Sequence, residues 1–144
     1  MSQSALLLGS GFVATPTVEV LTKSGVSVTV ACRTLASAEK LASRFPGTKS
    51  ISLDVNDTAA LEAEVAKHNV IISLIPYNFH AQVIKAAIKA KKHVCTTSYI
   101  SPVIQELDAA AKEAGITVLN EIGVRYTKLS PSMDILTVEA RPWY

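Results

Sequence analysis

Short apolar segments alternate with amphipathic segments along most of this 144-residue chain, and this alternation constrains the fold more than any other feature. The apolar segments are rich in β-branched residues, and we expect them to form strands at residues 5–8, 26–32, 50–53, 70–75, 93–97 and 117–120. Their near-continuous hydrophobicity is typical of strands buried on both faces of a parallel sheet. Strand–helix alternation with short connections therefore predicts an α/β fold, a doubly wound parallel sheet with helices on both faces.

The segments between the strands have apolar residues at helical spacing and residues that fit helix ends. The expected helices lie within residues 16–25, 35–45, 57–68, 78–92 and 102–115. Helix-terminating glycine or a Pro-Gly pair follows three of them, at Gly25, residues 46–47 and Gly115. The expected N-caps are Asn56 or Asp57, Asn78, and Ser101, with Pro102 at the first helical position after Ser101.

The composition is that of a soluble globular chain, with 49% hydrophobic residues, 18% charged residues and a formal net charge of +2. So small a net charge produces no global field that attracts nucleic acid or an anionic membrane, and neither is expected as a partner. The longest apolar run, residues 70–75, is far shorter than the roughly 18 to 20 residues of a membrane span. The first residues also lack the pattern of a signal peptide, so we expect a cytoplasmic protein.

Neither the cysteines nor the histidines are grouped as a disulfide framework or a metal site requires. Cys32 and Cys95 fall on the second and fifth expected strands, and the first and fourth strands should lie between them. That separation is roughly 14 Å, well beyond the reach of a disulfide. His68, His80 and His93 are scattered, and each is expected to be solvated or at the core edge rather than a ligand. No metal site is therefore expected.

The first expected strand leads directly into the sequence "GSGFVA" at residues 9–14, which has the pattern G-x-G-x-x-A and opens a helix. Gly9 allows a tight turn, Gly11 lets the backbone approach a pyrophosphate, and Ala14 lets helix and strand pack closely. An ordinary turn of small residues is the alternative, but the position after the first strand favours dinucleotide binding. We expect residues 1–123 to form a dinucleotide-binding, Rossmann-like domain, and residues 124–144 an irregular tail that is no separate domain.

The end of the second expected strand indicates which dinucleotide is bound. NAD-binding domains commonly place a carboxylate there, but this strand ends in Cys32, Arg33 and Thr34, with no carboxylate before Glu39. Arg33 can pair with the 2′-phosphate of NADP and stack on the adenine, while Thr34 can donate its hydroxyl. A merely solvated Arg33 is the alternative. The sequence therefore predicts NADP rather than NAD.

The ends of the later strands supply further candidate residues. Asp54 and Val55 follow the third strand, where Asp54 can either meet the adenine edge or cap the next helix. Ile75 places an apolar surface near the nicotinamide end of the cofactor. Polar residues 96–99 follow the fifth strand, at the edge where parallel sheets bind ligands, although a polar loop without function would look similar.

Several segments together resemble saccharopine dehydrogenase of the NADP-dependent, L-glutamate-forming type, also called saccharopine reductase. They are "LLLGSGFV", "VTVACRTLASAEKL", "SLDVND", "ISLIPYNFHAQVIKAAIKAKKHVCTTSYIS" and "LDAAAKEAGITVLNEIG", and they span residues 5–123. The resemblance implies an oxidoreductase of lysine biosynthesis that converts saccharopine, NADP⁺ and water to glutamate, aminoadipate semialdehyde and NADPH.

The resemblance also implies which residues meet the cofactor and the substrate, and it singles out no general acid. With Gly9 from the glycine turn, the expected cofactor contacts are Ser10, Gly11, Phe12, Val13, Cys32, Arg33, Thr34, Asp54, Val55, Ile75, Thr97 and Ser98. Ser98 and Tyr99 are expected to touch the amino-acid substrate as well.

After residue 123 the chain departs from the family pattern, and its length leaves no room for the family's substrate domain. We therefore expect a truncated cofactor-binding portion whose exposed apolar face favours self-association. The tail is either a genuine variant end or a read-through of an intron. A non-catalytic module that binds or senses NADP(H) is the alternative function. A short-chain reductase is excluded because Tyr77, Tyr99 and Tyr126 are not followed four residues later by lysine.

Overall fold

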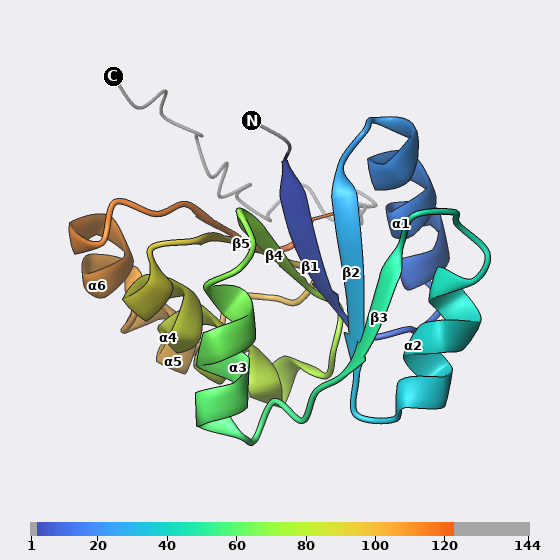
Figure 1. The fold of residues 1–144 in the computed structure, drawn as a ribbon. Coiled ribbons are helices and arrows are strands. Elements are labelled where there is room, and N and C mark those ends of the chain that lie inside the picture. Colours follow the sequence, from blue (N-terminus) through green and yellow to red (C-terminus); the bar gives the residue numbers. More distant parts are fainter. Residues whose placement is uncertain (1–2, 123–144) are drawn as a thin grey trace, which may run out of the picture.

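The structure is a computed structural model that describes residues 3–122, and a single parallel sheet forms its centre (Figure 1). The sheet has six strands in the order β3-β2-β1-β4-β5-β6. The strands are β1 (Ser4–Leu8), β2 (Ser27–Cys32), β3 (Lys49–Ser52), β4 (Val70–Ser73), β5 (His93–Thr96) and β6 (Val118–Leu119). All neighbouring strands pair in parallel, and the chain winds outwards from β1 in both directions. The doubly wound α/β prediction is confirmed.

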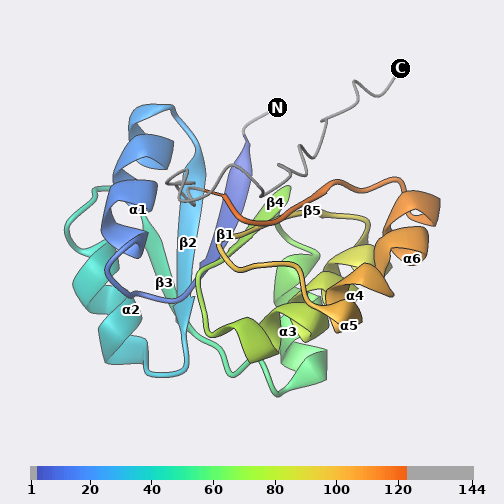
Figure 2. The ribbon, with the colours of Figure 1, turned by 180° about the vertical axis from the view of Figure 1, so that it is seen from behind.

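Helices cover both faces of the sheet, as the views from the two sides show (Figures 1 and 2). The helices are α1 (Ala14–Lys23), α2 (Leu35–Ala42), α3 (Thr58–Val65), α4 (His80–Ala90), α5 (Pro102–Gln105) and α6 (Asp108–Glu113), with a 3₁₀ turn η1 (Tyr77–Phe79) before α4. Two apolar clusters lie between the helices and the sheet. Leu7 of β1 packs with Ala14 and Val18 of α1 in one cluster, whereas Leu6 and Leu8 belong to the other. Alternate side chains of β1 thus serve opposite faces, as the pleat of a strand requires.

Most of the expected helix ends are observed, and two expectations are wrong. The Asp57 side chain accepts a hydrogen bond from the amide of Ala60, and Ser101 caps α5 in the same way with Pro102 behind it. Asn78 is no N-cap, because it lies inside η1 and α4 begins only at His80. The segment 102–115 is not one helix but two, α5 and α6.

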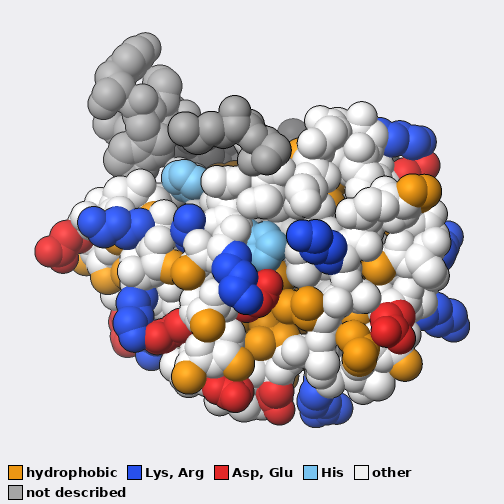
Figure 3. Space-filling view, viewed as in Figure 1, with side chains coloured by type: hydrophobic (Ala, Val, Ile, Leu, Met, Phe, Trp, Pro, Cys, Tyr) orange, Lys and Arg blue, Asp and Glu red, His pale blue; other side chains and the backbone are white. Residues whose placement is uncertain are grey.

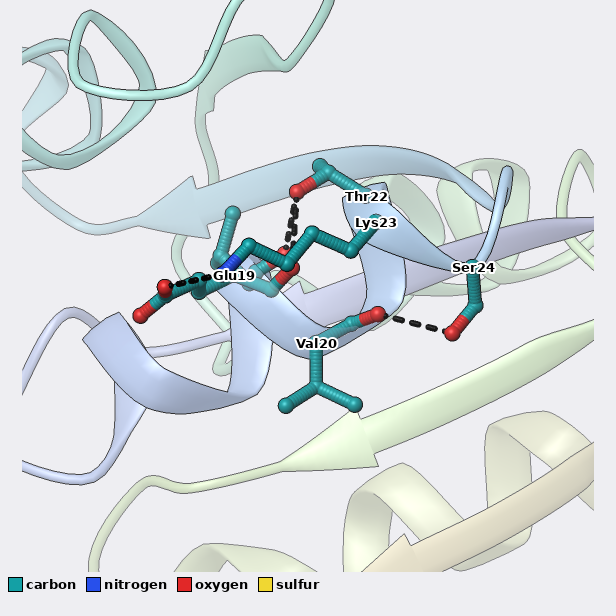
Figure 4. Close-up of polar contacts among 6 residues, drawn as sticks. Glu19, Val20, Thr22, Lys23 and Ser24 are labelled. Atoms are coloured by element: carbon teal, nitrogen blue, oxygen red, sulfur yellow. Dashed lines mark hydrogen bonds and ion pairs between the residues drawn. The ribbon is translucent and has the colours of Figure 1, made fainter.

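The last turn of α1 is held by side chains of the helix itself (Figure 4). Lys23 forms an ion pair with Glu19 at 2.7 Å, and the hydroxyl of Ser24 donates to the carbonyl of Val20 at 2.9 Å. The hydroxyl of Thr22 donates to the carbonyls of Val18 and Glu19. The last carbonyls of α1 are paired by backbone amides, since Gly25 donates to Thr22 and Val26 donates to Leu21, and the side-chain contacts add to these bonds, so α1 ends in a defined place before β2 begins.

Cys32 lies on β2 and Cys95 on β5, and both thiols are free, as expected from their separation. Within residues 3–122, no group of three or more His, Cys, Asp or Glu side chains is arranged to hold a metal ion. No helix in this part of the chain is long and apolar enough to cross a membrane. The expected tail at residues 124–144 lies outside the described residues.

Candidate functional site

A cavity of about 310 Å³ opens at the carboxyl edge of the sheet, where the loops after β1, β2, β3 and β4 converge. Its lining comprises Leu8, Gly9, Ser10, Ala31, Cys32, Arg33, Thr34, Ser37, Leu53, Asp54, Val55, Asn56, Ile75, Pro76 and Phe79. The strand order reverses between β1 and β4, and this is the point at which open α/β sheets bind ligands. The cavity therefore lies where folds of this type bind their ligands.

Gly9 is the residue at which the chain turns from β1 towards α1. Its φ of +105° lies in a region that L side chains rarely adopt, and its amide donates to the carbonyl of Ala31 at 2.9 Å. A Cβ at this position would lie 3.1 Å from the backbone oxygen of Leu74. The protein's own backbone therefore requires glycine here, whether or not a ligand is bound.

Gly11 differs, because nothing in the protein's own packing requires it. A Cβ built at Gly11 meets no atom within 4 Å and would project into open space. Within residues 3–122, the amides of residues 10 to 13 donate to no acceptor, and α1 follows directly at Ala14. Unpaired amides ahead of a helix N-terminus form an anion site, and the open space at Gly11 admits the anion. The chain thus fits the pyrophosphate of a dinucleotide at this turn.

Arg33 supplies a positive charge at the rim of the cavity. Its side chain is exposed, and its guanidinium forms no ion pair or hydrogen bond with any residue between 3 and 122. Its backbone is nevertheless held, because its carbonyl accepts from the hydroxyl of Ser52 at 3.1 Å. Thr34 stands at the N-cap position of α2 without a side-chain capping bond, and its hydroxyl has no partner in the part of the chain that the structure describes, so it is available to a ligand there. A free guanidinium beside a free hydroxyl suits a phosphate.

The structure separates the two roles left open for Asp54. The cap of α3 is Asp57, whereas Asp54 accepts from the amide and the side-chain nitrogen of Asn56, both at 2.9 Å. Both hydrogen bonds engage Oδ1 of Asp54, and the residue lines the cavity. Asp54 therefore shapes the loop after β3 and faces the space where a ligand would lie.

The residues after β4 and β5 lie next to the cavity rather than all within it. β4 ends at Ser73, two residues earlier than expected, although the amide of Leu74 still donates to the carbonyl of Leu8 at 2.9 Å, and Pro76 beyond it has no amide with which to continue the ladder. Ile75 lines the cavity, but Thr97, Ser98 and Tyr99 do not. The loop after β5 is held in place by the amide of Glu121, which donates to the carbonyl of Ser98 at 3.2 Å.

His80 contradicts the expectation that it is solvated or at the edge of the core. Its side chain is fully buried at the start of α4, with Nδ1 2.8 Å from the hydroxyl oxygen of Ser73 and Nε2 2.7 Å from that of Ser98. Burial lowers the pKa of His80 below its usual value, so the ring is neutral at pH 7. Its spacing from Val83 and Ile84, which share the buried face of α4, was a cue that the sequence interpretation missed.

The expected cofactor and substrate residues divide into three groups. Those that line the cavity are Gly9, Ser10, Cys32, Arg33, Thr34, Asp54, Val55 and Ile75. Those on the exposed turn are Gly11, Phe12 and Val13, and those on the neighbouring loop are Thr97, Ser98 and Tyr99. The sequence interpretation missed Ser37 and Phe79, which line the cavity from α2 and η1. The contacts of all the expected residues with a cofactor or substrate stay predictions.

The charges around the site are local. Lys and Arg side chains are interspersed with Asp and Glu side chains over the face seen in Figure 3, without a broad area of one sign. Because the formal net charge of the chain is only +2, an anionic ligand is attracted by Arg33 and the turn amides rather than by a field of the whole chain.

Comparison with known proteins identifies a family and several relatives that this chain resembles. Residues 5–119 match the family described as the saccharopine dehydrogenase NADP binding domain. The chain is 64% identical over 135 residues to saccharopine dehydrogenase (NADP(+), L-glutamate-forming) of Pyricularia oryzae, covering 94% of this chain and 29% of that protein. It is 52% identical over 137 residues to the protein of the same name from Saccharomyces cerevisiae, covering 94% of this chain and 29% of that protein.

A solved structure agrees with these relationships. The apo saccharopine dehydrogenase (L-Glu forming) from S. cerevisiae superposes with a TM-score of 0.82 at 54% identity, covering 85% of this chain and 27% of that chain. The chain spans about 29% of the length of the two relatives. The aligned share of this chain, 94%, also extends past residue 123 into the segment expected to be a tail.

Proposed function

The chain belongs to the saccharopine dehydrogenase NADP-binding-domain family, and from that premise we propose that its carboxyl-edge cavity binds NADP(H). The pyrophosphate lies against the unpaired amides at residues 10 to 13, and the 2′-phosphate of the adenosine ribose lies between Arg33 and Thr34. The single observation that carries the proposal is the guanidinium of Arg33 at the rim of this cavity, which has no ion-pair or hydrogen-bond partner among residues 3–122. A carboxylate at that position would instead select NAD.

We propose further that the complete protein is an oxidoreductase of the saccharopine dehydrogenase type. It converts saccharopine, NADP⁺ and water to glutamate, aminoadipate semialdehyde and NADPH, as a step of lysine biosynthesis. The nicotinamide, when bound, supplies the hydride chemistry. The residues of this chain bind and orient the cofactor, and at the neighbouring loop Ser98 meets both the cofactor and the amino-acid substrate, while Tyr99 meets the substrate.

A titration of the purified chain with NADPH and, separately, with NADH tests the proposal. Saturable binding with a clear preference for NADPH is the expected result, measured by the change in NADPH fluorescence. Arg33→Ala should remove most of the preference, and Arg33→Asp should reverse it by repelling the 2′-phosphate. Lys112→Ala on α6 is the matched control, because it removes one positive charge away from the cavity. A preference unchanged in both Arg33 variants would refute the proposed site.

A non-catalytic module that binds or senses NADP(H) is the second candidate. One observation favours it, namely that eight of the expected cofactor residues line the cavity, whereas the sequence indicates no general acid within residues 3–122. Turnover of saccharopine with NADP⁺ separates the two functions. NADPH binding without turnover supports the module, and turnover supports the enzyme.

A further inference from the structure

Three side chains from separate elements form a continuous hydrogen-bonded line beside the candidate site. Ser73 at the end of β4 contacts Nδ1 of His80 at 2.8 Å, and Nε2 of His80 contacts the hydroxyl of Ser98 at 2.7 Å. Ser73 and His80 have no exposed surface, whereas Ser98 is partly exposed. The line therefore begins in the core and ends at a hydroxyl that a ligand can reach.

The buried end of the line determines the direction of its protons. Within residues 3–122, the hydroxyl of Ser73 has no hydrogen-bond partner other than His80. If Nδ1 carried the proton, the hydroxyl proton of Ser73 would be buried without an acceptor, which is costly. Ser73 therefore donates to Nδ1, and a neutral ring then carries its proton on Nε2. That proton is donated to the oxygen of Ser98.

We propose that His80 is a positioning residue that holds the Ser98 hydroxyl as a hydrogen-bond donor towards the cofactor. Because Ser98 accepts from His80, its own proton is free to point away from the ring, towards the carboxyl edge of the sheet. The group that it meets must be a hydrogen-bond acceptor, and the amide oxygen at the nicotinamide end of the cofactor has this chemistry. This inference rests on the proposed function.

The backbone supports this role, because Ser98 is fixed at two points. Its carbonyl accepts from the amide of Glu121 at 3.2 Å, while its hydroxyl is held by His80. Next to it, the hydroxyl of Thr96 donates to the side chain of Asn120 at 3.0 Å. A donor fixed before the ligand arrives loses little conformational entropy when it binds.

The first test measures the tautomer of His80 in the unmodified chain by nitrogen-15 NMR of its imidazole at neutral pH. The expected result is a neutral ring with its proton on Nε2. A proton on Nδ1, or a charged ring at neutral pH, overturns the proposal. This measurement needs no cofactor, so it decides the direction of the protons even if the chain fails to bind NADPH and the proposed function is wrong.

The second test is a double-mutant cycle on the Kd for NADPH. Ser98→Ala and His80→Asn should each weaken binding about threefold to tenfold, as the loss of one hydrogen bond predicts. The double variant should be no weaker than Ser98→Ala alone, because His80 acts through the Ser98 hydroxyl. If the His80→Asn effect is as large without the hydroxyl as with it, His80 has only a structural role and the proposal fails.

His80→Gln provides the matched control. The amide nitrogen of glutamine can take the place of Nε2, whereas the asparagine side chain reaches only the place of Nδ1. We therefore expect His80→Gln to retain most of the NADPH affinity that His80→Asn loses. Equal losses in the two variants would contradict donation from Nε2. Should either variant fail to fold, the tautomer of the unmodified chain still decides the proposal.

Discussion

The two glycines of the turn after β1 should respond differently to alanine. Gly9 has a φ of +105° and no room for a side chain, since a Cβ would lie 3.1 Å from the oxygen of Leu74. Gly11 has neither constraint, because its Cβ would meet nothing within 4 Å. Gly9→Ala should therefore destabilise the fold, whereas Gly11→Ala should leave the fold intact and disturb only the ligand.

The magnitudes follow from these geometries. Holding alanine at the backbone conformation of Gly9 costs about 1–3 kcal/mol. Alanine also restricts the unfolded chain, which stabilises the folded state by about 0.4–1 kcal/mol. The crowding against Leu74 adds to the cost, so the free energy of unfolding of Gly9→Ala should fall by roughly 1–3 kcal/mol. For Gly11→Ala it should stay the same or rise by up to about 1 kcal/mol. NADPH affinity should fall at least about tenfold in Gly11→Ala, because the Cβ occupies the space proposed for the pyrophosphate.

Urea denaturation followed by circular dichroism measures the free energy of unfolding, and the change in NADPH fluorescence measures the affinity for NADPH. Gly25→Ala is the control, because Gly25 also has a positive φ, +78°, but lies in open space at the end of α1. It should lose stability, by about 1 kcal/mol, without losing NADPH affinity. A Gly9→Ala variant as stable as the unmodified chain would refute the strain argument. A Gly11→Ala variant with unchanged NADPH affinity would refute the placement of the pyrophosphate.

Three further outcomes follow from individual contacts. Asp57→Ala should lower the free energy of unfolding by about 1 kcal/mol in urea denaturation, because α3 loses its N-cap, and an unchanged value would contradict the capping role. Burial raises the pKa of the Cys95 thiol, so it should be alkylated slowly, while bound NADPH should protect Cys32 in the cavity. Mass spectrometry follows both sites, and NADPH protection of Cys95 but not Cys32 would argue against the proposed site. Burial lowers the pKa of His80 from its usual 6.5, so the unfolded chain protonates first and stability should decline as the pH falls below about 6.5. Urea denaturation between about pH 5 and pH 8 tests this, and the same pH slope in His80→Gln would show that His80 is not responsible.

Local patterns in the sequence determined the fold class and much of the site. Continuous apolar segments separated by short helical segments can form little else than a doubly wound parallel sheet, and the structure confirms it. The pattern G-x-G-x-x-A at residues 9–14 located the turn, and Arg33 without a nearby carboxylate indicated the phosphate. These features are readable because each depends on residues adjacent in sequence, where backbone geometry and charge act directly.

Other features were decided by the tertiary structure alone. The sequence left Asn56 and Asp57 as caps for α3 and gave Asp54 two possible roles, as a cap or at the adenine edge, and only the path of the loop after β3 assigned the cap to Asp57. His80 offered no motif, and its part in the line from Ser73 to Ser98 exists because β4 and β5 pair in parallel and bring their carboxyl ends together. Hydrogen bonds between residues distant in sequence depend on strand register and helix position, which periodicity does not encode. The sequence therefore determined which groups are present at this edge of the sheet, and packing decided which of them touch.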